Sequence, residues 1–185
     1  MRTKRTTIFL IPLLILVSHS MALGQAFMTD SGTAVFHSEV PLHTFSGSSD
    51  FLTGRIDLED KTVDFYLDLH TLETGIDKRD RDMLETLEAE EFPFAEFFGK
   101  LTSNFDPENT SPQTVTVEGD FKIHGVTNET KITGTLQMTD NGLLVKAGWT
   151  LLLKDYDIEP PKLLFVKVDQ QQDIEIEALL KPVED

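Results

Sequence analysis

The stretch KRDRDMLETLEAEEFP, residues 78–93, has a hydrophobic spacing that the segments around it lack. Good helix formers fill it, and three apolar residues recur at positions i, i+1 and i+4, the spacing of one helix face: Met83, Leu84 and Leu87. Asp77 is suited to the N-cap, and Pro93 stops the helix because proline lacks a backbone N–H donor. The sequence therefore predicts one short helix over residues 77–91.

The rest of the chain alternates between apolar and polar residues, as strands with one buried face do. Thr62–His70 shows this most clearly, since Val63, Phe65 and Leu67 fall on one face and Asp64 falls on the other. Seven further strands are expected at Thr33–Val40, Phe51–Leu58, Phe94–Ser103, Thr114–His124, Glu129–Met138, Leu143–Lys154 and Lys162–Leu180. Eight strands joined by hairpin-length connections predict an all-β fold, either an antiparallel barrel or a sandwich.

A helix that interrupts a closed sheet has to bury its apolar face, and one end of the barrel offers the place. We therefore expect the helix to act as a plug or lid over a cavity. The Ser/Gly-rich stretch Thr44–Asp50 is predicted to be a loop and a second candidate gate.

The first residues are typical of an export signal. Arg2, Lys4 and Arg5 precede an uncharged apolar run, Ile8–Val17, that is too short to span a bilayer. Ala22-Leu23-Gly24 is a small-x-small cleavage site, and Ser18-His19-Ser20 is an earlier alternative. We expect a signal peptide over residues 1–24, a single domain over residues 25–185, and a periplasmic or secreted product.

The composition of the chain excludes several kinds of protein and of binding partner. The chain has no cysteine, which excludes a lipoprotein anchor after the apolar run and a disulfide scaffold. Removing the three basic residues of the signal leaves 13 basic against 32 acidic residues, a net charge of −19. Such a charge repels phosphate backbones and anionic headgroups, so nucleic acid and stable membrane insertion are not expected. The sequence leaves a homodimer open.

Several motifs in order resemble the YceI-like family of exported lipid-binding proteins. They span about Ala34 to Pro182 and are Thr74-Gly75, Arg79-Asp80, Met83-Leu84, Phe92-Pro93-x-x-x-Phe97, Gly119-x-Phe121-x-Ile123-His124-Gly125-Val126-Thr127 and Asp155-Tyr156-x-Ile158. The Arg-Asp pair recurs at residues 81–82, so the sequence does not decide which of the two pairs corresponds to the family motif. The resemblance implies a lipocalin-like, eight-stranded antiparallel barrel whose apolar lumen holds a polyisoprenoid chain, such as an isoprenoid quinone tail, without catalysis or a metal.

Under this reading the inward apolar side chains are the candidate ligand-binding residues. They are Phe36, Phe65, Leu67, Met83, Leu84, Leu87, Phe97, Leu101, Phe121, Ile123, Trp149 and Leu151. The alternative is that the same side chains fill a packed structural barrel, which periodicity cannot distinguish from a ligand-filled one. For Arg79 and Arg81, surface ion pairs are the expected role and a contact with a lipid headgroup is the alternative.

No catalytic or metal site is predicted, and the bound lipid is expected as cargo rather than as a cofactor. The chain has no G-x-S-x-G turn, phosphate-binding loop or cysteine nucleophile. His37, Glu39 and His43 lie close in sequence but nothing completes a metal site. A hydrolase or isomerase acting on a hydrophobic substrate is the enzymatic alternative, and it would need convergent polar groups inside the cavity.

Overall fold

The computed structural model of the protein describes residues 26–40, 43–160, 162–163, 166–167 and 169–183. The expected signal peptide over residues 1–24 and the expected mature start at Gln25 lie outside the described residues.

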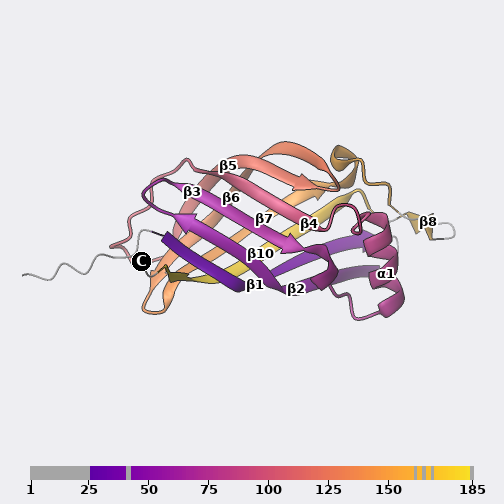
Figure 1. Cartoon of the computed structure of the whole chain (residues 1–185), viewed down its shortest axis with the longest axis horizontal. Coiled ribbons are helices and arrows are strands. Elements are labelled where there is room, and N and C mark those ends of the chain that lie inside the picture. The colour runs from indigo at the N-terminus through magenta and orange to yellow at the C-terminus, as the bar shows by residue number, and fades with distance from the viewer. Residues whose placement is uncertain (1–25, 41–42, 161, 164–165, 168, 184–185) are drawn as a thin grey trace, which may run out of the picture.

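Eight strands form one closed antiparallel barrel, as predicted (Figure 1). Neighbouring strands around the barrel follow the order β1-β10-β7-β6-β5-β4-β3-β2, and β1 closes the sheet by pairing with both β2 and β10. The strands are β1 (Ala26–Val40), β2 (His43–Asp57), β3 (Thr62–Asp68), β4 (Phe94–Leu101), β5 (Gln113–Ile123), β6 (Val126–Thr139), β7 (Gly142–Leu152) and β10 (Gln171–Pro182).

The remaining elements lie in the connections. They are the 3-10 helices η1 (Leu69–Thr71) and η2 (Leu153–Tyr156), the helix α1 (Asp77–Thr86), and the short strands β8 (Lys162–Leu163) and β9 (Val166–Lys167). The last predicted strand is thus divided: β8 and β9 form a separate two-stranded sheet, and only β10 joins the barrel. Figure 1 shows α1 and β8 at one end of the barrel, with the start of β1 and the described C-terminus at the other.

Apolar and polar residues that alternate in the sequence alternate between buried and exposed positions in the structure. In β3, Val63, Phe65 and Leu67 are buried while Asp64 and Tyr66 between them are exposed. The inward face of each strand therefore points to the lumen, because successive side chains of a strand leave opposite sides of the sheet.

Two glycines make room for inward aromatic rings. A Cβ on Gly47 would lie 2.4 Å from Cε1 of Phe36, and a Cβ on Gly54 would lie 2.1 Å from Cε1 of Phe65. Both glycines lie opposite these aromatics on neighbouring strands. The predicted loop at Thr44–Asp50 is therefore wrong: these residues belong to β2 and pair with β1, and Gly47 serves packing rather than a turn.

Helix α1 ends five residues earlier than predicted. Glu88 adopts a left-handed conformation with φ 48°, and the N–H groups of Ala89 and Glu88 donate to the carbonyls of Leu84 (3.0 Å) and Glu85 (3.1 Å). These two bonds form a Schellman motif. Its left-handed position is usually a glycine, so a glutamate there could not be recognised from the sequence as a helix end. The predicted Asp77 N-cap is also wrong: Ile76 occupies that position without a side-chain cap, and Asp77 is the first helical residue.

The glycine–aromatic packing predicts a stability difference between two positions. Replacing Gly54 with alanine should destabilise the fold by about 1–3 kcal/mol, because the new methyl group overlaps the buried Phe65 ring. Gly148→Ala is the matched control, since its Cβ would meet nothing closer than 3.4 Å. Thermal denaturation followed by circular dichroism measures both, and equal midpoints for the two variants would contradict this account.

Candidate functional site: an apolar lumen beneath helix α1

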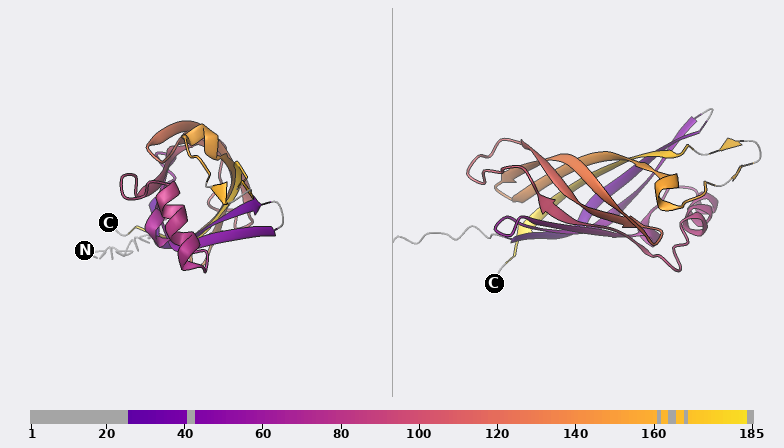
Figure 2. Two further views of the ribbon diagram at one scale, coloured as in Figure 1. Left: turned by 90° about the vertical axis from the view of Figure 1, so that its right-hand side faces the viewer. Right: turned by 90° about the horizontal axis from the view of Figure 1, so that it is seen from above.

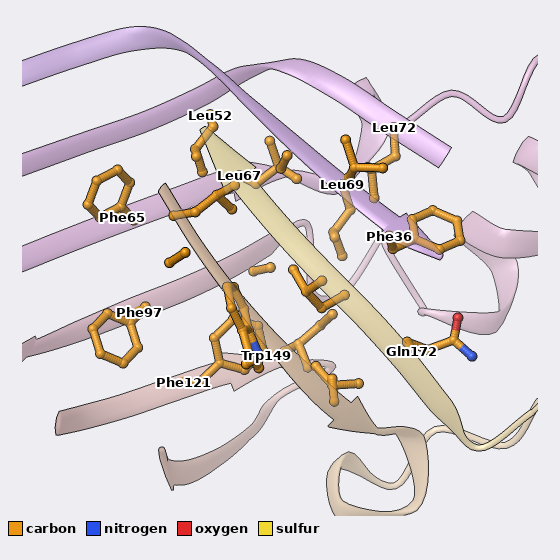
Figure 3. Close-up of a pocket in the computed structure, with 18 of the residues that line it drawn as sticks. Phe36, Leu52, Phe65, Leu67, Leu69, Leu72, Phe97, Phe121, Trp149 and Gln172 are labelled. Carbon is orange, nitrogen blue, oxygen red and sulfur yellow. The ribbon is translucent and has the colours of Figure 1, made fainter. Parts of the chain in front are cut away.

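A cavity of about 630 Å³ lies inside the barrel (Figure 3). This volume falls within the range of about 300–1,000 Å³ that small-molecule sites occupy. Inward side chains of every barrel strand line it, and nearly all of them are apolar. A fully packed barrel is therefore excluded for the described structure.

The end of the barrel far from α1 is closed by packing. Four side chains at that end are almost completely buried, with exposures of 0–2%: Phe27, Ile56, Leu143 and Leu180. Phe27 lies opposite Ile56 in the β1–β2 ladder, and Leu143 lies opposite Leu180 in the β7–β10 ladder. Ile56 forms the floor of the cavity, so the lumen opens toward α1.

Helix α1 crosses the open end of the barrel (Figure 2). The residues that the helix and its C-cap contribute to the cavity wall follow helical spacing and form one stripe: Lys78, Arg79, Asp82, Met83, Thr86 and Leu87. Met83 and Leu87 are partly buried against the core, whereas Arg81 is exposed and lies outside the stripe. Of the two Arg-Asp pairs, Arg79 and Asp82 therefore line the cavity, whereas Asp80 and Arg81 do not.

Aromatic rings line the lumen along its length. Phe121 packs edge-on against both Trp149 and Tyr156, with ring centroids 5.7 Å apart in each pair. Phe36 packs in the same way against Phe45, at 6.0 Å, near the α1 end. In Figure 3, Phe65 and Phe97 lie toward one end of the view, while Phe36 and Gln172 lie toward the other.

The polar groups of the lumen gather near α1. Gln172 is buried, and its side-chain Nε2 donates to the backbone carbonyls of Asp169 (2.9 Å) and Gln171 (2.8 Å). Arg79 donates from Nε to Thr74 Oγ1 at 2.9 Å and from Nη2 to the Thr74 carbonyl at 2.8 Å. The deeper part of the cavity is lined mainly by aliphatic and aromatic groups, and Lys146, one of its few polar residues, pairs with Glu177 at 2.9 Å.

Eleven of the twelve candidate residues line the cavity. They are Phe36, Phe65, Leu67, Met83, Leu87, Phe97, Leu101, Phe121, Ile123, Trp149 and Leu151. Leu84 does not line it, although its side chain is partly buried against the core. Contact between the eleven residues and a ligand stays a prediction.

Sequence reasoning missed part of the lining. Leu69, Val115 and Ile174 fall in the same inward phase as the chosen residues, so the alternation could have identified them. Phe45 was missed because its strand was read as a loop. Gln172 lies two residues before Ile174 and shares its inward phase, but it was missed because only apolar residues were chosen.

Neither a metal cluster nor a membrane helix occurs in the described part of the chain. No group of three or more His, Cys, Asp or Glu side chains there is arranged to hold a metal ion. The side chains of Glu39 and His43, two members of the weak sequence cluster, lie outside the described ones. None of the helices among the described residues has the length and apolar character of a membrane span.

The family model for the YceI-like domain matches residues 26–180, which is most of the chain. The protein belongs to the YceI-like family. Among curated proteins, none matches this YceI-like chain by sequence.

Solved structures share the fold of this YceI-like protein at low sequence identity. A polyisoprenoid-binding domain from Saccharophagus degradans is 16% identical, with a TM-score of 0.74, and the match covers 86% of this chain and 99% of that one. BcnA from Burkholderia cenocepacia is 11% identical, with a TM-score of 0.65, covering 80% and 94%. The YceI protein of Campylobacter jejuni is 13% identical, with a TM-score of 0.55, covering 99% and 100%.

Trp149 offers a direct probe of the lumen because it is the only tryptophan of the chain and lines the cavity. Adding a long-chain alcohol such as dodecanol should shift its emission to shorter wavelength, since an apolar guest replaces water beside the indole. Trp149→Phe should abolish the signal. Unchanged emission while dodecanol co-elutes with the protein would place the guest elsewhere.

Proposed function

We propose that this YceI-like protein is exported and sequesters a polyisoprenoid chain, such as an isoprenoid quinone tail, without catalysing a reaction on it. The observation that carries the proposal is the apolar cavity of about 630 Å³ inside the closed barrel, beneath α1. The polyisoprenoid-binding domain from Saccharophagus degradans has the same fold, which supports a lipid of this class as cargo.

The physical basis is the removal of hydrocarbon from water. Burying apolar surface stabilises a complex by about 25 cal/mol per Å², and an isoprenoid tail is apolar along its whole length. The barrel wall has no free edge between its eight strands, so the lumen can hold the chain away from water without exposing unpaired backbone groups. The acidic exterior would keep the loaded protein dispersed.

Loading requires an opening, and α1 is the element that covers the only end not filled by core packing in the described structure. We propose that α1 moves to admit the chain. The second gate expected from sequence, Thr44–Asp50, is not proposed again because it lies within β2.

An enzymatic role has less support than the sequestration of a lipid. The described polar groups lining the lumen lie mainly at the α1 end, and several of them are already occupied: Gln172 Nε2 by backbone carbonyls, and Lys78 by Asp82 at 2.6 Å. The deeper lumen, where a buried substrate would lie, presents mainly aliphatic and aromatic side chains. Sequestration needs only the exclusion of water, which this lining supplies.

Filling the lumen should abolish binding. Ala147 lines the cavity, so Ala147→Phe should displace the lipid, whereas Thr133→Phe adds the same ring to the exposed face of β6 and should leave binding intact. Native mass spectrometry of the protein purified from its own host without detergent measures the bound mass and the oligomeric state. A wild-type protein that carries no lipid, and takes up neither quinones nor polyprenols, would contradict the proposal.

Export should depend on the apolar run at Ile8–Val17. Placing arginine at both Leu13 and Leu14 should retain the chain inside the cell, because a signal peptide requires an uncharged apolar core. Cell fractionation followed by N-terminal sequencing measures this, with Gln25 as the expected first residue of the exported protein. Equal export of the variant and the wild type would rule out this signal.

A further inference from the structure

We propose that Arg79 selects a lipid with an anionic headgroup, a phosphate or a carboxylate, and holds that headgroup at the α1 end of the lumen. This inference rests on the proposed function and adds the chemistry of the ligand's polar end. It also fixes the direction in which the ligand lies, with its tail toward Ile56 at the closed end.

The guanidinium of Arg79 is held in place from two sides. Its Nε and Nη2 atoms donate to Thr74, to the hydroxyl at 2.9 Å and to the carbonyl at 2.8 Å. Its central carbon lies 4.7 Å from the centroid of the Phe45 ring, which is a cation–π contact. Asp80 fixes Thr74 in turn by accepting from its backbone N–H at 2.9 Å and from its hydroxyl. The cation is therefore positioned before any ligand arrives.

Arg79 makes no direct ion pair in the described part of the chain, and its hydrogen bonds reach a carboxylate, that of Asp80, only through the Thr74 hydroxyl. No described carboxylate oxygen lies within 4.0 Å of its guanidinium, whereas Lys78, on the same helix, pairs with Asp82 at 2.6 Å. A guanidinium carries five N–H donors, and Nη1 makes no hydrogen bond to a described residue.

Other polar atoms at this end also have spare hydrogen-bonding capacity. Gln172 uses its Nε2 on two backbone carbonyls, and its Oε1 accepts no hydrogen bond from a described residue. Ser38 is fully buried, and its Oγ has no partner among the described atoms. Ser38 lies opposite Gln172 on one side and Phe45 on the other, so these atoms and Arg79 share one end of the barrel. Of Gln172 and Ser38, only Gln172 lines the cavity, so its Oε1 is the atom of the two that a ligand in the lumen can reach.

The lumen and this polar end together define an amphiphile. The hydrocarbon lies among the apolar side chains, and the headgroup lies beside Arg79, whose planar fork matches the oxygens of phosphate and carboxylate. The net negative charge of the protein does not prevent this, because charges beyond about 8 Å are largely screened at physiological ionic strength. A neutral headgroup would leave the charge of Arg79 without a partner.

The test compares two arginines on one helix. Arg79→Gln and Arg81→Gln remove the same charge from α1, but only Arg79 lines the lumen. The ligands are geranylgeranyl monophosphate, geranylgeranoic acid and geranylgeraniol, which share one tail and differ in headgroup. Displacement of a lumen-bound fluorescent probe measures their affinities for the full-length mature protein.

The wild type should bind the two acids more tightly than the alcohol. Whichever of the phosphate and the carboxylate binds with the higher affinity is the headgroup that the site prefers. Arg79→Gln should weaken both acids by about tenfold while changing the alcohol little, because one charge-assisted contact is lost. Arg81→Gln should change none of the three. Arg79→Lys keeps the charge and should retain the preference for acids. If Arg79→Gln fails to fold, the affinities of Arg79→Lys for the three ligands still test the proposal.

Two failures are distinguishable. If all three ligands bind but Arg79→Gln weakens them equally or not at all, the headgroup assignment is wrong and the lipid carrier stands. If none of the three binds the wild type or any variant, the proposed function and this inference both fail.

Discussion

Closure of the sheet through β1 is the constraint on which the rest of the structure depends. β1 pairs with β2 along most of its length and with β10 on its other side, so the ladder ends where it begins. A closed sheet of eight strands has a fixed circumference, and its inward side chains either fill the interior or leave a cavity. Here one end is filled by core residues and the other is covered by α1, and the space between them is the lumen.

The shape of the lumen depends on aromatic rings that pack directly against glycines of neighbouring strands. Phe36 packs over Gly47 and Phe65 packs over Gly54, which draws each ring toward the wall and leaves space at the centre. The helix above carries both the apolar side chains that cover the lumen and the arginine beside its opening. One short element therefore combines closure with the recognition of a polar group, and both depend on the same helical stripe.

Much of the fold and of the candidate site could be predicted from sequence, for a physical reason. A strand shows its buried face as a simple alternation, so Val63, Phe65 and Leu67 could be placed inward without coordinates. The errors arose where local composition misleads. Gly47 looked like part of a turn but seats a ring from a neighbouring strand, and Glu88 ended α1 in a conformation that usually requires glycine.

The sequence by itself determined the strand and helix content, the inward faces and the apolar character of the interior, because these depend on neighbours along one segment. Only the tertiary structure decided that a cavity exists, which end is closed, and that Arg79 rather than Arg81 lies beside the lumen. Those features depend on distances between segments far apart in the chain. Gln172 and Ser38 become neighbours of each other only when β10 pairs with β1, and no local pattern records that register.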